Sequence, residues 1–257
     1  MPHPRALSPL LAAAGLGLAL TSTGVSAAVI LDDDFEDGTN PGYTVVPGPT
    51  TNDTATVTTD PAAGGLDTNV LLLSTVSNNR RLNRDFDAIT LAVDGDYLEV
   101  SVDYRLAQDL NDRDAVNIGF AAADGSEAGA RFNPTAGGNQ GIYYTDLSNN
   151  NGRFDTIASG TDPHSVTVRL TRESETVARL NASFDGQPRD PSNDVLLGAD
   201  FTAPLTYDSL RLGWVNGNAG DLYFDNVLVT SNVVVPEPAS LTLAALGLTA
   251  CMLRRRS

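Results

Sequence analysis

The feature that most constrains the fold of this chain is an alternation of apolar and polar residues with a period of two. It recurs between Ala28 and Val235, and it is clearest at 98–106, 165–171, 178–184 and 210–214. Successive side chains of a strand point to opposite faces of a sheet, so each stretch predicts a strand with one buried and one wetted face. Helical periodicity is hard to find in the same span.

Residues typical of tight turns separate these predicted strands: Asp94-Gly95-Asp96, Asp124-Gly125, Asn151-Gly152, Asp185-Gly186 and Asn216-Gly217-Asn218. Asn-Gly and Asp-Gly pairs favour the turns that join antiparallel strands. About a dozen short strands with few helices predict an all-β fold, an antiparallel two-sheet β-sandwich of the jelly-roll kind. No repeat of 20–50 residues is evident, which argues against a β-helix or a propeller.

The charge composition excludes several classes of function. The chain has 32 acidic residues against 16 basic ones, all of them Arg, and its formal net charge is −16. Such a surface repels phosphate, so no nucleic-acid partner is expected. One Cys and two His are too few for a disulfide framework or a Cys/His zinc site. What remains is an acidic globular protein.

The N-terminus has the three parts of a secretory signal. His3 and Arg5 make a weakly basic start, an apolar run covers 7–20, and small residues precede a cleavage site after Ala27. The apolar run is shorter than the ~20 residues that a membrane-spanning helix requires, which favours a cleaved signal over an anchor. We therefore predict export.

The C-terminus has three parts in a different order. Pro236, Glu237 and Pro238 form an extended spacer, an apolar stretch follows at 241–253, and the chain closes with Arg254, Arg255 and Arg256. The Arg cluster would stay in the cytoplasm, so the stretch, a short hydrophobic helix, predicts transient anchoring in the inner membrane.

This tail resembles the PEP-CTERM sorting signal of Gram-negative and related bacteria. The resemblance implies an exosortase-type processing enzyme as partner, and delivery of the body to the cell envelope, outer surface or exopolysaccharide matrix. We expect three segments: a signal peptide at 1–27, a β-sandwich domain at 28–231, and a sorting and anchor segment at 232–257. Without residues 1–27 and 236–257 the body keeps 12 Arg and 31 acidic residues.

Three stretches of the body resemble jelly-roll carbohydrate-binding modules and concanavalin A-like or laminin G-like domains. They are Leu31–Gly38 (LDDDFEDG), Ala178–Gly186 (ARLNASFDG) and Leu222–Val229 (LYFDNVLV). The resemblance implies two antiparallel sheets with the first and last strands side by side, often a calcium ion, and often glycan binding.

A structural Ca²⁺ site at Asp34, Glu36 and Asp225 is one expectation, because carboxylate oxygens suit this ion. The parity of the last strand puts Asp225 toward the core unless a β-bulge lies near Asp225 and Asn226. The alternative is that Asp225 accepts backbone hydrogen bonds and that the acidic run at 32–34 is a solvated edge. No other cofactor is expected.

A glycan site is a second expectation, because sugar sites combine an aromatic platform with polar side chains. The candidates are Arg131, Asn133, Tyr144, Asn150 and Arg153. The alternative is that Tyr143 and Tyr144 divide between core and surface, and that the Asn tract before Gly152 is a plain turn. Trp214 shares an apolar stripe, which places it in the core.

Catalytic constellations are not found in the sequence. Glu99 and Asp103 share one strand face but fit the wetted side of an outer strand, and His164 at a strand start fits a surface position. We therefore predict a non-catalytic surface or matrix protein that binds glycan. The alternatives are a polysaccharide hydrolase or lyase with an unfamiliar site, and a purely architectural coat protein.

Overall fold

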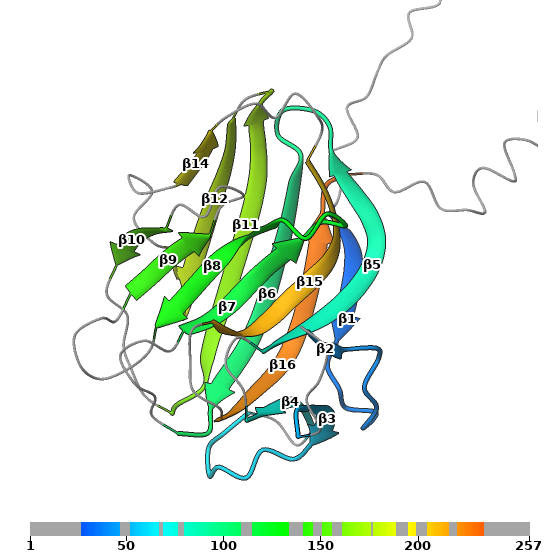
Figure 1. The fold of residues 1–257 in the computed structure, drawn as a ribbon, viewed down its shortest axis with the longest axis vertical. Helices are drawn as coiled ribbons and strands as arrows, with labels where there is room; N and C mark the ends of the chain where they lie inside the picture. The colour runs from blue at the N-terminus through cyan, green and yellow to red at the C-terminus, as the bar shows by residue number, and fades with distance from the viewer. Residues whose placement is uncertain are drawn as a thin grey trace, which may run out of the picture.

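The computed structural model describes twelve stretches of the chain: 27–46, 52–66, 69–76, 80–108, 115–133, 141–145, 151–155, 161–175, 177–188, 195–198, 205–215 and 220–233. Every regular element among them is a strand (Figure 1). The all-β fold predicted from the alternation is confirmed. The short hydrophobic helix expected at 241–253 lies outside the described residues.

The first eight strands are β1 (Ala28–Asp33), β2 (Thr44–Val46), β3 (Thr54–Thr58), β4 (Val70–Thr75), β5 (Arg81–Leu91), β6 (Tyr97–Leu106), β7 (Ala115–Ala121) and β8 (Glu127–Asn133). The remaining eight are β9 (Gly141–Thr145), β10 (Asn151–Asp155), β11 (His164–Ser174), β12 (Val177–Phe184), β13 (Gln187–Pro188), β14 (Val195–Gly198), β15 (Leu205–Val215) and β16 (Gly220–Ser231).

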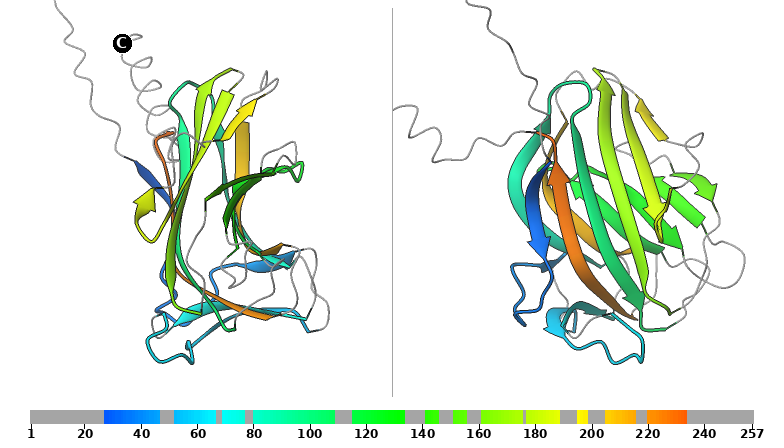
Figure 2. Two further views of the ribbon diagram at one scale, coloured as in Figure 1. Left: turned by 90° about the vertical axis from the view of Figure 1, so that its left-hand side faces the viewer. Right: turned by 180° about the vertical axis from the view of Figure 1, so that it is seen from behind.

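The strands form two antiparallel sheets packed as two layers, seen edge-on in the left view of Figure 2. The nine-stranded sheet has the order β13-β12-β11-β6-β16-β4-β3, with β1 added to β16 and β14 added to β12. The seven-stranded sheet has the order β10-β9-β8-β7-β15-β5-β2. The first and last strands, β1 and β16, are direct neighbours, as the resemblance to jelly-roll modules implied.

The core lies between the layers and is made by one parity of each strand. Leu98, Val100 and Val102 of β6 are buried, while Glu99 and Ser101 between them are only partly buried. Trp214 of β15 is fully buried, which confirms its predicted place in the core. The alternation seen in the sequence is therefore the alternation between core and outer face.

The turn predictions are confirmed where the structure describes them, with one exception. Gly95, Gly125 and Gly186 adopt φ values of +90°, +85° and +70°, which only glycine adopts without strain. Asn151 and Gly152, however, lie inside β10 and pair with Thr145 and Tyr144. The prediction of a turn at these two residues is wrong, because both are paired with residues of β9. The turn predicted at 216–218 lies outside the described residues.

Candidate functional site

The outer face of the seven-stranded sheet carries two rows of residues that cross neighbouring strands. The first row is Arg153, Tyr143, Arg131, Asn117, Gly213 and Arg81, in the order β10, β9, β8, β7, β15 and β5. The second row is Asn151, Thr145, Gly129, Gly119, Arg211 and Asn83, in the same order of strands. Along β7 and β15, core residues such as Ile118 and Leu212 alternate with the row positions, so these strands present the rows on the face away from the core.

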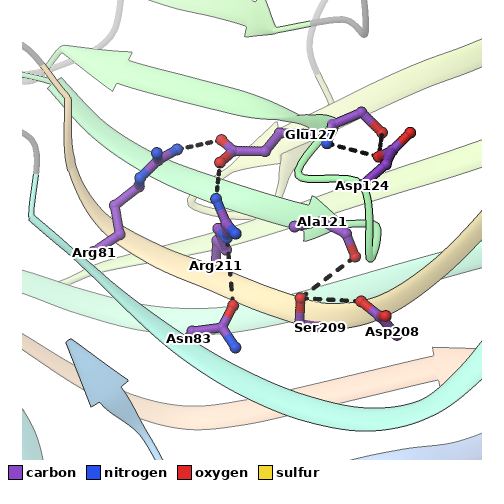
Figure 3. A network of polar contacts seen from close by, with 9 residues as sticks. Arg81, Asn83, Ala121, Asp124, Glu127, Asp208, Ser209 and Arg211 are labelled. Atoms are coloured by element: carbon purple, nitrogen blue, oxygen red, sulfur yellow. Dashed lines mark hydrogen bonds and ion pairs between the residues drawn. The ribbon is translucent and has the colours of Figure 1, made fainter. Parts of the chain in front are cut away.

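Glu127, at the start of β8, is the centre of a polar network on this face (Figure 3). One of its carboxylate oxygens accepts a hydrogen bond from Nη1 of Arg81, and the other accepts one from Nη1 of Arg211. Nε of Arg211 also donates to Oδ1 of Asn83 at 3.3 Å. Strands β5, β8 and β15 thus bring together residues that are up to 130 positions apart in the chain.

Arg131 lies close enough to this network for the charges of Arg81 and Glu127 to act on it. Partial burial lowers the pKa of its guanidinium, repulsion from Arg81 lowers that pKa further, and attraction to Glu127 works in the opposite direction. Its Nε is buried and has no hydrogen-bond partner in the part of the chain that the structure describes. Arg131 is therefore a cation beside an ion-pair network that leaves its Nε unused.

The structure places the predicted glycan residues unevenly. Arg131 is on the outer face, and the register puts Arg153 in the same row through Tyr143. Asn133 ends β8, where it pairs with Gly141. Tyr144 pairs with Ala130, a core position, so its neighbour Tyr143 stands in the row of Arg131. Asn150 lies outside the described residues, so the predicted site as a whole stays a prediction.

Sequence reasoning missed Arg81, Arg211 and Glu127. The signal for their direction was available, because each sits at an outward parity: Arg81 precedes the core residue Leu82, and Arg211 lies between Leu210 and Leu212. What the pattern did not contain was the order of the strands. Only the adjacency of β8, β7, β15 and β5 brings these side chains to one place.

A β-bulge near Asp225, one of the two alternatives that the parity of the last strand left open, is present. The register of β16 against β6 shifts between Asp225 and Leu228, and Asn226 adopts a φ of +49°. Asp225 is 2% exposed, and its Oδ1 accepts a hydrogen bond from the backbone amide of Asn226 at 2.8 Å. This contact matches the alternative in which Asp225 serves backbone hydrogen bonds.

Asp34 and Glu36, the other two predicted calcium ligands, are exposed at the end of β1. A small pocket of about 100 Å³ lies there, lined by Asp32, Asp33, Asp34, Phe35, Asp37, Thr39 and Pro41. Within the described stretches, no group of three or more His, Cys, Asp or Glu side chains is arranged to hold a metal ion. The structure thus does not gather the three predicted carboxylates as a ligand set, and calcium binding stays a prediction.

The remaining candidates have structural partners. Glu99 pairs with Arg169 at 2.7 Å, and Asp103 accepts a hydrogen bond from Nδ2 of Asn226 at 2.9 Å, both on the outer face of the nine-stranded sheet. His164 was expected at the surface, but it is 7% exposed. Its ring packs on Phe184, and its Nδ1 lies 3.0 Å from a carboxylate oxygen of Asp185, because the hairpin turn folds back over it.

Comparison with known families identifies the tail. Residues 234–257 match the PEP-CTERM protein-sorting motif. This chain carries a PEP-CTERM sorting tail. The motif is the signal for exosortase-type processing, so the protein is exported and has a C-terminal sorting segment. Its residues Pro236, Glu237, Pro238 and 254–256 lie outside the described stretches. Ala27, the predicted signal-cleavage position, is exposed and directly precedes β1.

Solved structures similar to the body share its two-sheet fold. Cellulose induced protein Cip1 is 16% identical, with a TM-score of 0.53, covering 77% of this chain and 96% of that one. A carbohydrate esterase from the Shiga toxin-encoding bacteriophage phi24B is 12% identical, with a TM-score of 0.53, covering 81% and 100%. The globular domain of T. cruzi calreticulin is 14% identical, with a TM-score of 0.51, covering 79% and 88%.

At these identities the similarity shows the fold alone, a sandwich shared by catalytic and non-catalytic proteins. The search of curated proteins gives no match to this chain. Among the described residues, no helix has the length and apolar character to cross a membrane.

Proposed function

We propose that this exported protein is a non-catalytic component of the cell surface or the exopolysaccharide matrix, and that its β-sandwich binds glycan on the outer face of the seven-stranded sheet. The observation that carries the proposal is the row in which Arg131 stands beside Tyr143 and, one strand further, Arg153. A row of guanidinium and aromatic residues across adjacent strands suits the hydroxyl groups and apolar faces of successive sugars. The names of two similar structures, a cellulose induced protein and a carbohydrate esterase, agree with this class of ligand.

The hydrogen bonds of Glu127 support a binding role over hydrolysis. Both of its carboxylate oxygens accept hydrogen bonds from guanidinium groups, one from Arg81 and one from Arg211, so neither oxygen is free to act as the acid or base of hydrolysis.

A glycan array with the full-length chain, in Ca²⁺ and in EGTA, tests the proposal. We expect binding to a defined class of polysaccharide, and loss of that binding in Arg131→Gln. Arg169→Gln is the matched control, because it removes the same charge from the opposite sheet. A blank array in both buffers, with the protein folded and at the cell surface, would instead support an architectural coat protein.

The same array ligands also separate binding from catalysis. Each bound polysaccharide is incubated with the protein and analysed for new reducing ends and for unsaturated sugars. We expect neither product. New reducing ends alone would favour a hydrolase, and unsaturated sugars would favour a lyase. Either result would overturn the non-catalytic assignment.

Calcium at the acidic end of β1 is a separate proposal, and it concerns structure and not glycan contact. Asp34 and Glu36, two of the three predicted ligands, are exposed there, so a divalent cation bound to their carboxylates would stabilise this segment. We expect a rise in Tm on adding Ca²⁺ that EGTA reverses, and a smaller rise in Asp34→Asn. No heat of binding in calorimetry and no change in Tm would exclude the site.

A further inference from the structure

The arginines of this protein divide into two groups by how their charge is balanced. Six of the described arginines each lie within 4.0 Å of a different carboxylate: Arg80 with Asp53, Arg84 with Asp33, Arg105 with Asp60, Arg169 with Glu99, Arg172 with Asp94 and Arg179 with Glu173. The other three arginines with described side chains, Arg81, Arg131 and Arg211, have only Glu127 between them.

This imbalance is unusual for the composition of the chain. The body has 31 acidic residues for 12 Arg, so a carboxylate for each guanidinium is in ample supply. Among the described side chains, these three guanidinium groups nevertheless share a single ion-pair carboxylate, that of Glu127. An excess of like charge that is partly withdrawn from water costs free energy, and it attracts an anion from outside the protein.

The geometry leaves this excess within reach of a ligand. The side chains of Arg81 and Arg211 are each 20% exposed, and that of Glu127 is 15% exposed, so the cluster is held firmly but still contacts solvent. Glu127 accepts a hydrogen bond from Nη1 of each arginine, and Nε of Arg81 has no hydrogen-bond partner among the described residues. Figure 3 shows Arg81 and Arg211 converging on Glu127 from β5 and β15.

Arg131 is the part of the cluster that lacks an internal contact. It forms no ion pair or hydrogen bond with the described residues, and the charges that act on it are Arg81 and Glu127. It stands in the first row of the outer face, opposite Tyr143 of β9. Because no described residue accepts a hydrogen bond from this guanidinium, it can donate hydrogen bonds to a ligand.

We propose that Arg81, Arg131 and Arg211 bind the carboxylate groups of an acidic, uronate-containing polysaccharide. A planar carboxylate matches the fork of donors on a guanidinium, and one carboxylate on each sugar suits a cluster spread over several strands. A polymer with denser charge, such as a nucleic acid, would be repelled by the rest of a protein at −16. This inference rests on the proposed function and adds the chemical class of its ligand.

Calorimetry with a matched pair of ligands tests the proposal: oligomers of galacturonic acid, and oligomers of galactose of the same length. The full-length chain is titrated with each in EGTA, at low and at high salt. We expect the charged oligomer to bind at least ten times more tightly at low salt, and high salt to weaken it. Arg131→Gln should weaken it about 10- to 100-fold, as expected for lost charge-assisted hydrogen bonds.

Two variants separate the effect of the site from general effects of charge. Arg131→Lys keeps the charge without the fork, and we expect it to recover part of the lost affinity. Arg169→Gln, on the other sheet, should change the affinity less than twofold. Circular dichroism and Tm of each variant confirm that the fold is intact.

The outcomes distinguish this inference from the function on which it rests. Equal affinity for both oligomers, or an unchanged affinity in folded Arg131→Gln, would overturn the uronate proposal and leave glycan binding standing. Binding of the neutral oligomer alone would have the same consequence. Binding of neither oligomer would overturn the uronate proposal, and only a blank array as well would remove the glycan-binding function.

Discussion

The outer faces of the two sheets use arginine in opposite ways. On the nine-stranded sheet Arg169 pairs with Glu99 at 2.7 Å and stacks at 4.0 Å over the ring of Tyr97, and Arg105 pairs with Asp60. On the seven-stranded sheet Arg81 and Arg211 share Glu127, and Arg131 pairs with no carboxylate among the described residues. The first arrangement satisfies each charge and stabilises the fold. The second leaves guanidinium groups without their own carboxylate, and such groups attract an anionic partner.

The strongest test of this difference is the buried pair of the nine-stranded sheet. Asp60 has a fully buried side chain, and Arg105, 3% exposed, also stacks at 4.6 Å on the ring of Tyr223. Asp60→Asn leaves the buried guanidinium without its counter-charge, so we expect the free energy of unfolding to fall by about 3 kcal/mol. Urea denaturation at neutral pH measures it, and a loss below about 1 kcal/mol would contradict a pairing role for this sheet.

The same pair predicts a pH dependence. Burial alone would raise the pKa of Asp60, but hydrogen bonds from Arg105 and from the amides of Ala62 and Leu66 outweigh it, and the net pKa is lowered. A lowered folded-state pKa contributes stability above the unfolded-state value of about 4, and this contribution is lost as the pH falls below it. The difference between the parent chain and Asp60→Asn should therefore shrink in acid.

Much of this fold follows from the sequence alone. The parity of β6, β11, β12 and β15 identified core and outer faces, and the bulge at Asp225 followed from a break in parity of β16. The site followed only in part. Arg131 was identified, but its neighbours Arg81 and Glu127 lie 46 positions apart in the chain. Strand order depends on long-range packing, and no local pattern encodes it.

His164 shows why a single residue can mislead. Its place at a strand start, after Pro163, predicts a surface side chain. The structure buries it because the turn at Asp185 and Gly186 returns the chain beside it, and Asp185 supplies a carboxylate for Nδ1. The residues that decide its burial are about twenty positions away, on the partner strand.

The next prediction concerns the close approach of β7 and β8 in the seven-stranded sheet. Gly119 and Gly129 pair across β7 and β8, and a Cβ on Gly129 would lie 2.6 Å from the carbonyl oxygen of Ile118 and 2.7 Å from Cα of Gly119. Gly129→Ala must push these strands apart, so we expect a loss of about 2 kcal/mol in the free energy of unfolding. Urea denaturation measures the loss. Gly125→Ala, at an open turn, is a control for strain from positive φ alone.

If the carboxylate of Glu127 stabilises the cluster, removing its charge should cost less than removing that of Asp60. Glu127→Gln leaves Arg81 and Arg211 partly exposed, so water can replace the lost ion pairs. We expect a loss of about 1 kcal/mol. Thermal unfolding compares the two variants directly. A loss equal to that of Asp60→Asn would show that both sheets use their arginines for stability, and the comparison between them would fail.

The smallest expected change is the most informative, because it concerns a residue whose removal should cost the fold nothing. Arg131 is repelled by Arg81, and burial disfavours its charge, so Arg131→Gln should leave the free energy of unfolding unchanged or raise it by about 0.5 kcal/mol. Arg169→Gln, which breaks an ion pair and a ring contact, should lower it by about 0.5–1 kcal/mol. Urea denaturation of both variants gives the two values.

The sign of the change in unfolding free energy for Arg131→Gln shows whether Arg131 stabilises the fold. A clear loss of stability would mean that Arg131 supports the fold, as Arg169 does, and the two sheets would no longer differ. A neutral or stabilising change, together with lost binding of galacturonate oligomers, would mean that the protein keeps an unfavourable charge on this face for its ligand. Arginines that stabilise the fold and arginines that bind a ligand would then lie on the outer faces of different sheets.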